Sequence, residues 1–259
     1  MKAAADVWHD DSMHNREIKI PATLVVTEQQ IDLSALSMGQ RDFYSNLFFE
    51  LVDKYEAEKK PRVVIGITGP TGAGKSVVAV LFKELARQAN IAFALEAVTI
   101  DAYHFSNRFL LSHFSNGVPL KEVKGRFDTY DADALARDIR AFSSGKSVSF
   151  PTYSRKLHEP IKDSIVVEAE NALLIVEGLW LLYDKAGWEA IGPLLNYSIF
   201  IEADPAKAKE PVLKRHMVGG RTFQEAARHY ELVDTRNSDL VLATKHKANK
   251  VIPAYYSIS

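Results

Sequence analysis

The chain has 259 residues, of which 32 are basic, 33 are acidic and none is cysteine. This length suits one large α/β domain with additions. The net charge of -1 removes the usual electrostatic reason to expect a nucleic acid or an anionic membrane as a partner. The absence of cysteine excludes disulfides, thiolate zinc sites and cysteine nucleophiles.

The N-terminal segment carries Asp6, Asp10 and Asp11 and has no apolar stretch, so it resembles neither a secretory signal nor a transit peptide. The most apolar window, Ala172 to Tyr183, is interrupted by Glu177. It is shorter than the roughly twenty residues that a membrane helix needs. We therefore expect a cytoplasmic protein with no membrane partner.

Residues 1–61 precede the rest of the chain as an addition. Short strands are expected at Glu17 to Val26 and at Gln30 to Leu33. A helix is expected from Arg41 to Lys59, where apolar side chains recur at helical spacing: Phe43, Leu47, Leu51 and Tyr55. The sequence thus predicts an N-terminal α+β extension. It covers a sheet edge, forms a homodimer contact or packs on the core, and periodicity does not decide among these.

Residues Gly69 to Ser76 match the pattern G-x-x-x-x-G-K-S directly after the apolar run Val63 to Ile67. The glycines let backbone N–H groups turn toward phosphate, Lys75 adds a positive charge, and Ser76 supplies a hydroxyl to magnesium. The next segment, Ser76 to Gln88, is expected to be a helix with its positive end facing the anion. The sequence predicts a nucleoside-triphosphate site, rather than a plain glycine-rich turn, at Gly69, Pro70, Thr71, Gly72, Ala73, Gly74, Lys75, Ser76 and Val77.

From Arg62 onward, apolar strand candidates alternate with helical patterns. This alternation predicts an α/β fold with a doubly wound parallel sheet of five strands flanked by helices, the fold of a P-loop NTPase. The domain is expected to span residues 62–259. Its strands are expected at Val63 to Thr68, Leu95 to Ile100, Ala172 to Val176, Tyr197 to Ile201 and Lys250 to Ile252.

Two segments stand apart from this alternation. Residues 102–163 form an insert that is expected to hold the acceptor-substrate region, with a helix near Ala132 to Phe142. Residues 205–236 are expected to form a helical lid, with helices from Pro205 to Met217 and from Thr222 to Asp234 on either side of two glycines.

Two acids follow predicted strands, where a doubly wound sheet places its ligand crevice. Asp101 is our candidate base, because a carboxylate there can orient an acceptor hydroxyl and take its proton late in phosphoryl transfer. Glu177 can hold magnesium directly or through water. The alternatives are a helix N-cap or an exposed loop acid for Asp101 and a turn acid for Glu177.

Basic residues lie on both expected lid helices: Lys214, Arg215, Arg221 and Arg228. A closing lid would bring positive charge to the migrating phosphoryl group, which can contribute about a thousandfold or more to the rate. Helix-surface arginines are usually only solvated. We select Arg215 and Arg221 as the catalytic candidates.

Six separated motifs resemble the phosphoribulokinase, uridine kinase and pantothenate kinase superfamily of P-loop kinases, and most of all its pantothenate-kinase-like and fructose-kinase-like branch. Beyond the phosphate loop they are Asp101 to His104, Lys124-Gly125 with Asp128 to Asp131, Tyr153 to Pro160, Val176 to Gly178, and Arg215-His216 with Gly219-Gly220, Asp234 and Asn237. The resemblance implies ATP and Mg2+ as cofactors, Lys75 and Ser76 at phosphate, and Asp101 as base. It also implies a lid arginine near Arg215 and an acceptor substrate facing Tyr153 to Arg155.

The chain departs from this family at two places. Phe127 stands where proline is common, and Arg155 stands where the acceptor segment often has histidine. A guanidinium there can clamp a carboxylate or fork two hydroxyls, unless it pairs with Glu159 or Asp163 on a solvated loop. The candidates for contact with the acceptor substrate are Tyr103, His104, Tyr153 and Arg155.

We therefore expect an ATP-dependent kinase that phosphorylates a hydroxyl of a sugar, sugar acid, nucleoside or pantothenate-like metabolite. A signalling GTPase fits poorly, because Asn249 to Ile252 lacks the acid that pairs with guanine. A nucleotide-binding ATPase or a non-catalytic nucleotide-sensing module remains the alternative.

Overall fold

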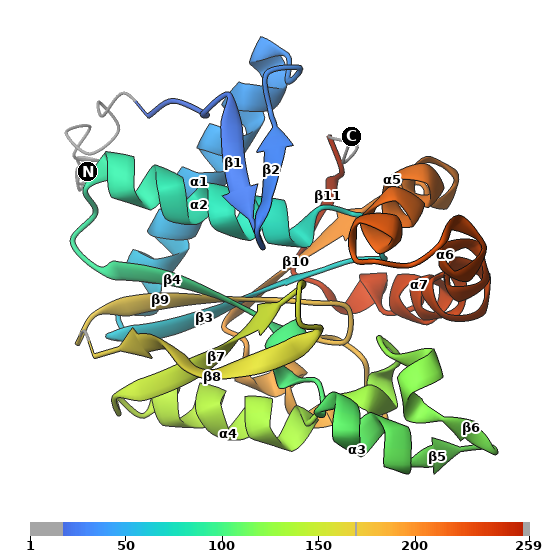
Figure 1. Ribbon diagram of the computed structural model, residues 1–259. Helices are drawn as coiled ribbons and strands as arrows, with labels where there is room; N and C mark the ends of the chain where they lie inside the picture. Colours follow the sequence, from blue (N-terminus) through green and yellow to red (C-terminus); the bar gives the residue numbers. More distant parts are fainter. Residues whose placement is uncertain (1–17, 169, 256–259) are drawn as a thin grey trace, which may run out of the picture.

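The computed structural model describes residues 18–168 and 170–255 (Figure 1). Its centre is a parallel five-stranded sheet in the order β11-β10-β3-β9-β4. The predicted α/β fold and all five predicted strands are confirmed. Their bounds are β3 Arg62–Thr68, β4 Ala94–Thr99, β9 Ala172–Glu177, β10 Tyr197–Glu202 and β11 Lys250–Pro253.

Helices cover both faces of the sheet, as Figure 1 shows. On one face lie α1 (Met38–Glu58) and α2 (Lys75–Ala89), and on the other lies α4 (Ala132–Ser143). Each face has its own apolar core, one around Phe48, Phe82 and Leu85, and one around Ile139 and Phe142. The central strands β3 and β9 are buried along their whole length, which explains their continuous apolar runs.

The N-terminal extension packs on α2 and shares its core. It comprises the hairpin β1 (Thr23–Val26) and β2 (Gln29–Asp32), followed by α1. Ser37 and Gln40 form a capping box at the start of α1. Arg41 then donates hydrogen bonds to the carbonyls of Ile20, Leu33 and Leu36 and so attaches the hairpin to the helix. The predicted start of the first strand at Glu17 lies outside the described residues.

The insert contains more strand than the sequence predicts. Besides α4 it holds α3 (Asn107–Ser112), the short pair β5 (Phe114–Ser115) and β6 (Val118–Pro119), and a long antiparallel hairpin. This hairpin, β7 (Val148–Ser154) and β8 (Glu159–Val167), has a register shift between Phe150 and Thr152 and many exposed residues on β8. An irregular, half-exposed hairpin lacks the continuous apolar run that marks the central strands.

The lid region differs from its prediction in its second helix. The first helix, α5, spans Pro205–Val218, close to the predicted range. The second, α6, ends at His229, and a π-helical turn at Tyr230–Asp234 leads into α7 (Thr235–Leu242). The prediction that the helix ends at Asp234 is therefore wrong, because a π turn keeps the chain helical there. Single π turns are frequent at functional sites.

Short 3-10 segments complete the chain and carry several site residues. They are Ile100–Tyr103, Leu120–Val123, Phe127–Thr129, Trp188–Ala190, Gly192–Leu194 and Lys245–Lys247. No helix in residues 18–168 or 170–255 has the length and apolar character needed to cross a membrane.

Candidate active site

The phosphate loop joins β3 to α2 and forms one wall of a cleft of about 640 Å³. Gly72 and Gly74 have φ angles of 80° and 85°, which residues with a side chain rarely adopt. Gly74 is the N-cap of α2, so the positive N-terminal end of this helix lies at the loop. The predicted loop residues Thr71, Gly72, Gly74, Lys75, Ser76 and Val77 line the cleft.

The other three predicted loop residues, Gly69, Pro70 and Ala73, are not among those that line the cleft. Gly69 has no room for a side chain, since a Cβ atom would lie 2.3 Å from the carbonyl oxygen of Ile201. Ala73 is fully buried. These residues support the loop from behind.

Lys75 folds back on its own loop. Its Nζ donates hydrogen bonds of 2.9 Å to the carbonyls of Gly69 and Pro70. Burial lowers the pKa of Lys75 to about 8, while Glu177 opposes this shift. An anion bound in the loop would give the ammonium group of Lys75 a negative partner in place of the two neutral carbonyls, and this would favour the charged form of Lys75. Contact between Lys75 and a phosphate stays a prediction.

Ser76 and Glu177, the predicted metal ligands, lie together. The hydroxyl of Ser76 donates a 2.8 Å hydrogen bond to Oε1 of Glu177. Burial and the negative charge of Asp101 raise the pKa of Glu177. Two mutually repelling acids beside a serine hydroxyl form an oxygen-rich group whose charge a hard divalent cation would balance.

Asp101 lies directly after β4, in the 3-10 segment Ile100–Tyr103, and lines the same cleft. The hydroxyl of Tyr130 donates to its Oδ1 over 3.4 Å. Burial opposes ionisation of Asp101, but His104 and two nearby arginines outweigh burial and hold its pKa below the usual value. Asp101 is therefore an ionised acceptor of protons near neutral pH.

Tyr103 and His104 have different places in the structure. Tyr103 points away from the cleft lining, because its hydroxyl donates a 2.7 Å hydrogen bond to Asp138 and its ring lies in the core around α4. Tyr103 is not among the residues that line the cleft, so its contact with substrate stays a prediction without support from this position. His104 does line the cleft; its Nδ1 bonds the carbonyl of Thr129 and its ring stacks on Tyr130. Burial lowers the pKa of His104 to about 4.

The end of β7 brings Tyr153 to the cleft, and the turn between β7 and β8 brings Arg155 there. Arg155 makes no ion pair with Glu159 or Asp163 in the described part of the chain, so the solvated-loop alternative is not observed. His158, on the same turn, bonds the carbonyl of Gly219 over 2.7 Å and so joins the turn to the lid.

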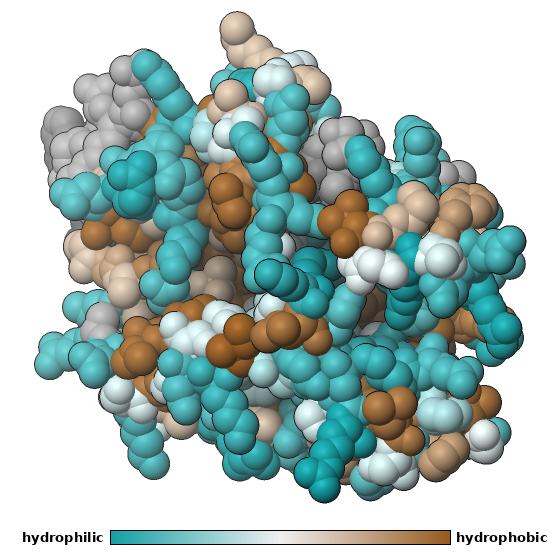
Figure 2. Space-filling view, viewed as in Figure 1, coloured by the Kyte–Doolittle hydropathy of each residue, from teal (hydrophilic) through white to brown (hydrophobic). Residues whose placement is uncertain are grey.

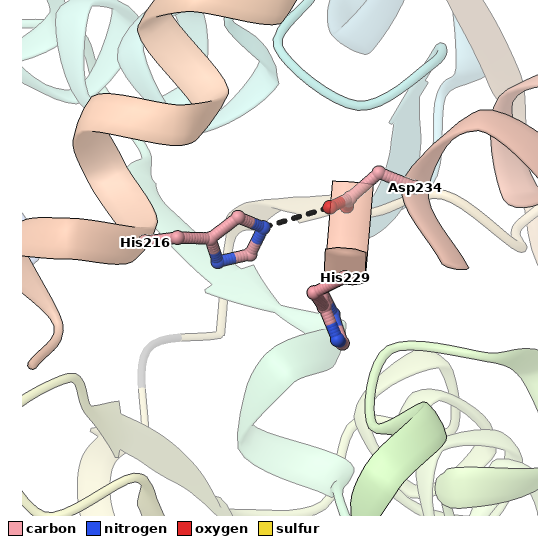
Figure 3. Close-up of side chains that lie close together, drawn as sticks. All are labelled: His216, His229 and Asp234. Atoms are coloured by element: carbon pink, nitrogen blue, oxygen red, sulfur yellow. Dashed lines mark hydrogen bonds and ion pairs between the residues drawn. The ribbon is translucent and has the colours of Figure 1, made fainter. Parts of the chain in front are cut away.

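The lid contributes Arg215 and Arg221 to the cleft, whereas Lys214 and Arg228 are exposed outside it. Arg221 donates a 2.9 Å hydrogen bond to Nδ1 of His216. Nε2 of His216 then donates to Asp234 over 2.7 Å, as Figure 3 shows. Burial lowers the pKa of His216, in agreement with a neutral ring that uses both nitrogens.

His216, His229 and Asp234 bring three metal-ligating atoms within 4.8 Å of one another (Figure 3). The cluster is better suited to holding the lid arginines than to binding a metal cation. Arg221 already bonds one nitrogen of His216, and its positive charge repels a cation. Sequence reasoning marked His216 and Asp234 only through the family resemblance.

Two groups of cleft residues were given no role from the sequence. Lys121 and Lys124 come from the insert and line the cleft. The sequence marked Lys124-Gly125 as a motif of the family but indicated no chemical role for it. Thr27 and Glu28, at the tip of the β1–β2 hairpin, also line the cleft, and Ser154 Oγ lies 3.5 Å from Oε1 of Glu28. Nothing local in the sequence indicates that this distant turn reaches the phosphate loop.

Figure 2 shows a central hollow bordered by both hydrophilic and hydrophobic side chains. The cleft thus holds a phosphate loop, a serine–carboxylate pair, a second acid and two arginines. This combination defines the class of P-loop kinases.

Phe127, at which the chain departs from the family pattern, has a packing role, because its ring contacts Trp180 and Tyr183.

Comparison with known proteins places the chain within this class. The model of the Phosphoribulokinase / Uridine kinase family matches residues 64–254, and the chain belongs to that family. It is 32% identical over 191 residues to the uncharacterized protein YggC of Escherichia coli, covering 74% of this chain and 77% of the relative. It is 28% identical over 200 residues to a uridine kinase of Clostridium perfringens, covering 75% and 88%.

A solved structure with the same fold is the D-glycerate 3-kinase of Cryptococcus neoformans. It superimposes with a TM-score of 0.60 at 15% identity, over 83% of this chain and 97% of that one. The chain is thus a phosphotransferase of the kinase type, and the predicted superfamily is confirmed.

Proposed function

We propose that this protein transfers the γ-phosphoryl group of ATP to a hydroxyl of a small metabolite. The observation that carries the proposal is that Asp101 lines the same cleft at the phosphate loop as the hydrogen-bonded pair Ser76 and Glu177. A nucleotide-sensing module needs a phosphate loop, but it has no need of a second, ionised carboxylate beside the triphosphate end.

The loop residues fit a triphosphate and its magnesium ion. Thr71 Oγ1 is buried at the cleft with no hydrogen-bond partner among the described residues, so a phosphate oxygen would satisfy it. Ser76 and Glu177 would hold Mg2+, which, when bound, neutralises charge on the phosphates. Lys75 and the N-terminal N–H groups of α2 would hold the phosphate oxygens.

Asp101 orients the acceptor. In the reaction the bond between the γ-phosphorus and the leaving oxygen of ADP breaks, and a bond forms between that phosphorus and the acceptor oxygen. The acceptor proton passes to the carboxylate of Asp101, late in a loose transition state. Its lowered pKa keeps the carboxylate ionised before transfer.

Arg215 and Arg221 stabilise the charge on the transferred group. Arg221 is held by the hydrogen-bond chain through His216 to Asp234, so its guanidinium needs little reordering. His216 and Asp234 are positioning residues in this scheme, because they act through Arg221.

The acceptor class follows from the cleft and the relatives together. Tyr153, Arg155 and His104 line the cleft together with Asp101. Tyr153 and Arg155 offer donors to hydroxyl or acidic groups, and neutral His104, whose Nδ1–H is bound to Thr129, offers Nε2 as an acceptor. The similarity to a uridine kinase makes a nucleoside one candidate, and sugars, sugar acids and pantothenate-like acids are the others.

The test is ATP consumption by the purified protein with and without each acceptor. Acceptor-dependent consumption is expected, and Asp101→Asn is expected to lose about 100-fold to 10,000-fold in turnover while it still binds ATP. Asp133→Asn, an exposed acid at the start of α4, is the control and should be unaffected. Equal ATP consumption without any acceptor would instead show an ATPase, and binding with no consumption would show a nucleotide sensor.

A further inference from the structure

Two lysines of the insert share one neutral acceptor. The ammonium groups of Lys121 and Lys124 both donate to Oδ1 of Asn107, Lys124 over 3.1 Å. Lys124 also donates to the carbonyl of His158 over 2.7 Å. Asn107 starts α3, and its own N–H donates to Glu159 over 2.8 Å, which orients the residue.

Negative charge acts on this pair without a direct ion pair, chiefly from Glu159. Neither lysine forms an ion pair with a carboxylate anywhere in residues 18–168 and 170–255, and the side chain of Glu159 is bound to the backbone of Asn107 instead. Lys124 is buried, and burial together with the charge of Lys121 lowers its pKa to about 8. An amide oxygen cannot neutralise two cations, and the single charge of Glu159 offsets only one of them. The pair therefore keeps a net positive charge beside the cleft, with Lys124 buried and Lys121 half-buried.

The pair lies on the acceptor side of the cleft. Both lysines line it, and Nζ of Lys124 lies 5.3 Å from the ring centre of Tyr153. Lys121, Glu159, Asp101 and Arg221 are the charged groups with the largest influence on Lys124. The triphosphate has its own cations in Lys75 and Arg215, so the lysine pair is available to a second anion.

We propose that Lys121 and Lys124 form an anion subsite for the acceptor, which is therefore a small alcohol that carries a carboxylate or phosphate group. This inference depends on the proposed kinase function and narrows its acceptor class. Arg155, which can clamp an acid bidentately, lies on the same cleft and completes the positive wall. Neutral sugars and nucleosides would leave this charge unbalanced.

The first experiment compares matched acceptors that differ in the acidic group: D-glycerate with glycerol, pantothenate with panthenol, and ribose 5-phosphate with ribose. The acidic member of at least one pair is expected to have a kcat/KM about 100-fold above its neutral partner. The carboxylate and phosphate arms show which anion the subsite takes. Equal use of neutral and acidic members would overturn the inference and leave the kinase function intact.

The second experiment removes one charge. Lys121→Met is expected to lower kcat/KM for the acidic acceptor about tenfold to 100-fold, mainly through KM, and to keep the KM for ATP. Lys162→Met, an exposed lysine on β8 outside the cleft, is the matched control and should have no effect. Circular dichroism and thermal unfolding establish that both variants fold.

A binding measurement keeps the inference separate from turnover. With the nucleotide site saturated by Mg2+ and the nonhydrolysable analogue AMP-PNP, calorimetric titrations with inorganic phosphate and with acetate are expected to show binding of at least one anion, which Lys121→Met weakens at least tenfold. This result without any acceptor turnover would support the subsite and contradict the kinase proposal. If neither anion binds, or if each binds equally to both proteins, the subsite does not exist.

Discussion

The tip of the β1–β2 hairpin should become more stable when its two turn residues are replaced. Val26 pairs with Gln29, so Thr27 and Glu28 form a two-residue turn, and their φ angles of 49° and 68° are both positive. Two-residue hairpin turns of this kind favour Asn-Gly, and a β-branched residue such as threonine is an outlier there. The double substitution Thr27→Asn and Glu28→Gly fits the same backbone without this strain.

The magnitude follows from the strain at each position. A left-handed conformation costs about 1–2 kcal/mol per residue for ordinary side chains, and less for asparagine and glycine. Glycine also lowers the free energy of unfolding by about 0.5–1 kcal/mol, because it gives the unfolded chain more conformational entropy. The net gain is about 1.5 kcal/mol, which for a protein of this size raises Tm by about 3–6 °C.

Thermal unfolding followed by circular dichroism measures this gain, and acceptor kinetics on the same variant measure its functional cost. Because the hairpin tip lines the cleft and Glu28 contacts Ser154, KM for the acceptor should rise while Tm rises. The single variant Thr27→Asn keeps the carboxylate of Glu28. It should gain stability and change the KM for the acceptor less than the double variant does. An unchanged or lower Tm for the double variant would refute the assignment of strain to this turn.

Three other substitutions test the site. Lys75→Ala should weaken ATP binding about tenfold or more and abolish transfer, because it removes the cation of the phosphate loop; unchanged kinetics would remove Lys75 from the mechanism. Arg155→His should change kcat/KM among acceptors more than the KM for ATP, and an unchanged acceptor profile would contradict a substrate role for this turn. His229→Gln tests acid stability: burial and then Arg221 lower the pKa of His229 to about 4, below the value of about 6.5 in the unfolded chain. The native state therefore resists protonation, and stability present above pH 6.5 is lost as the pH falls toward 4, by roughly 3 kcal/mol for this residue. Urea unfolding of His229→Gln should depend less steeply on pH in that window, and an identical slope would show that His229 does not titrate as described.

The sequence was sufficient to predict the central sheet, because β3 and β9 are buried on both faces and so consist of uninterrupted apolar residues. The phosphate loop was equally predictable, since its backbone conformations at Gly72 and Gly74 require particular residue types at fixed spacing. Asp101 and Glu177 followed from a topological rule that places polar residues at the carboxyl ends of parallel strands over the ligand crevice.

The remaining parts of the cleft depend on tertiary contacts that local patterns do not contain. Tyr103 follows Asp101 closely in the sequence, but the 3-10 turn directs its hydroxyl to Asp138 on α4. Thr27 and Glu28 reach the phosphate loop only because the extension packs along α2. The β7–β8 hairpin was missed because its exposed, irregular strands show neither alternation nor a buried run.

The acceptor side and the lid are connected by consecutive hydrogen bonds. Lys124 binds the carbonyl of His158, and the ring of His158 binds the carbonyl of Gly219, between α5 and α6. The same hinge precedes Arg221, whose guanidinium is held by His216. If an acceptor anion moves Lys124, the movement would act on the turn that is hydrogen-bonded to the lid, and this is a physical route by which acceptor binding would affect the placement of Arg221. Such coupling would let the enzyme complete its positive charge around ATP only when a substrate is present, which limits wasteful transfer to water.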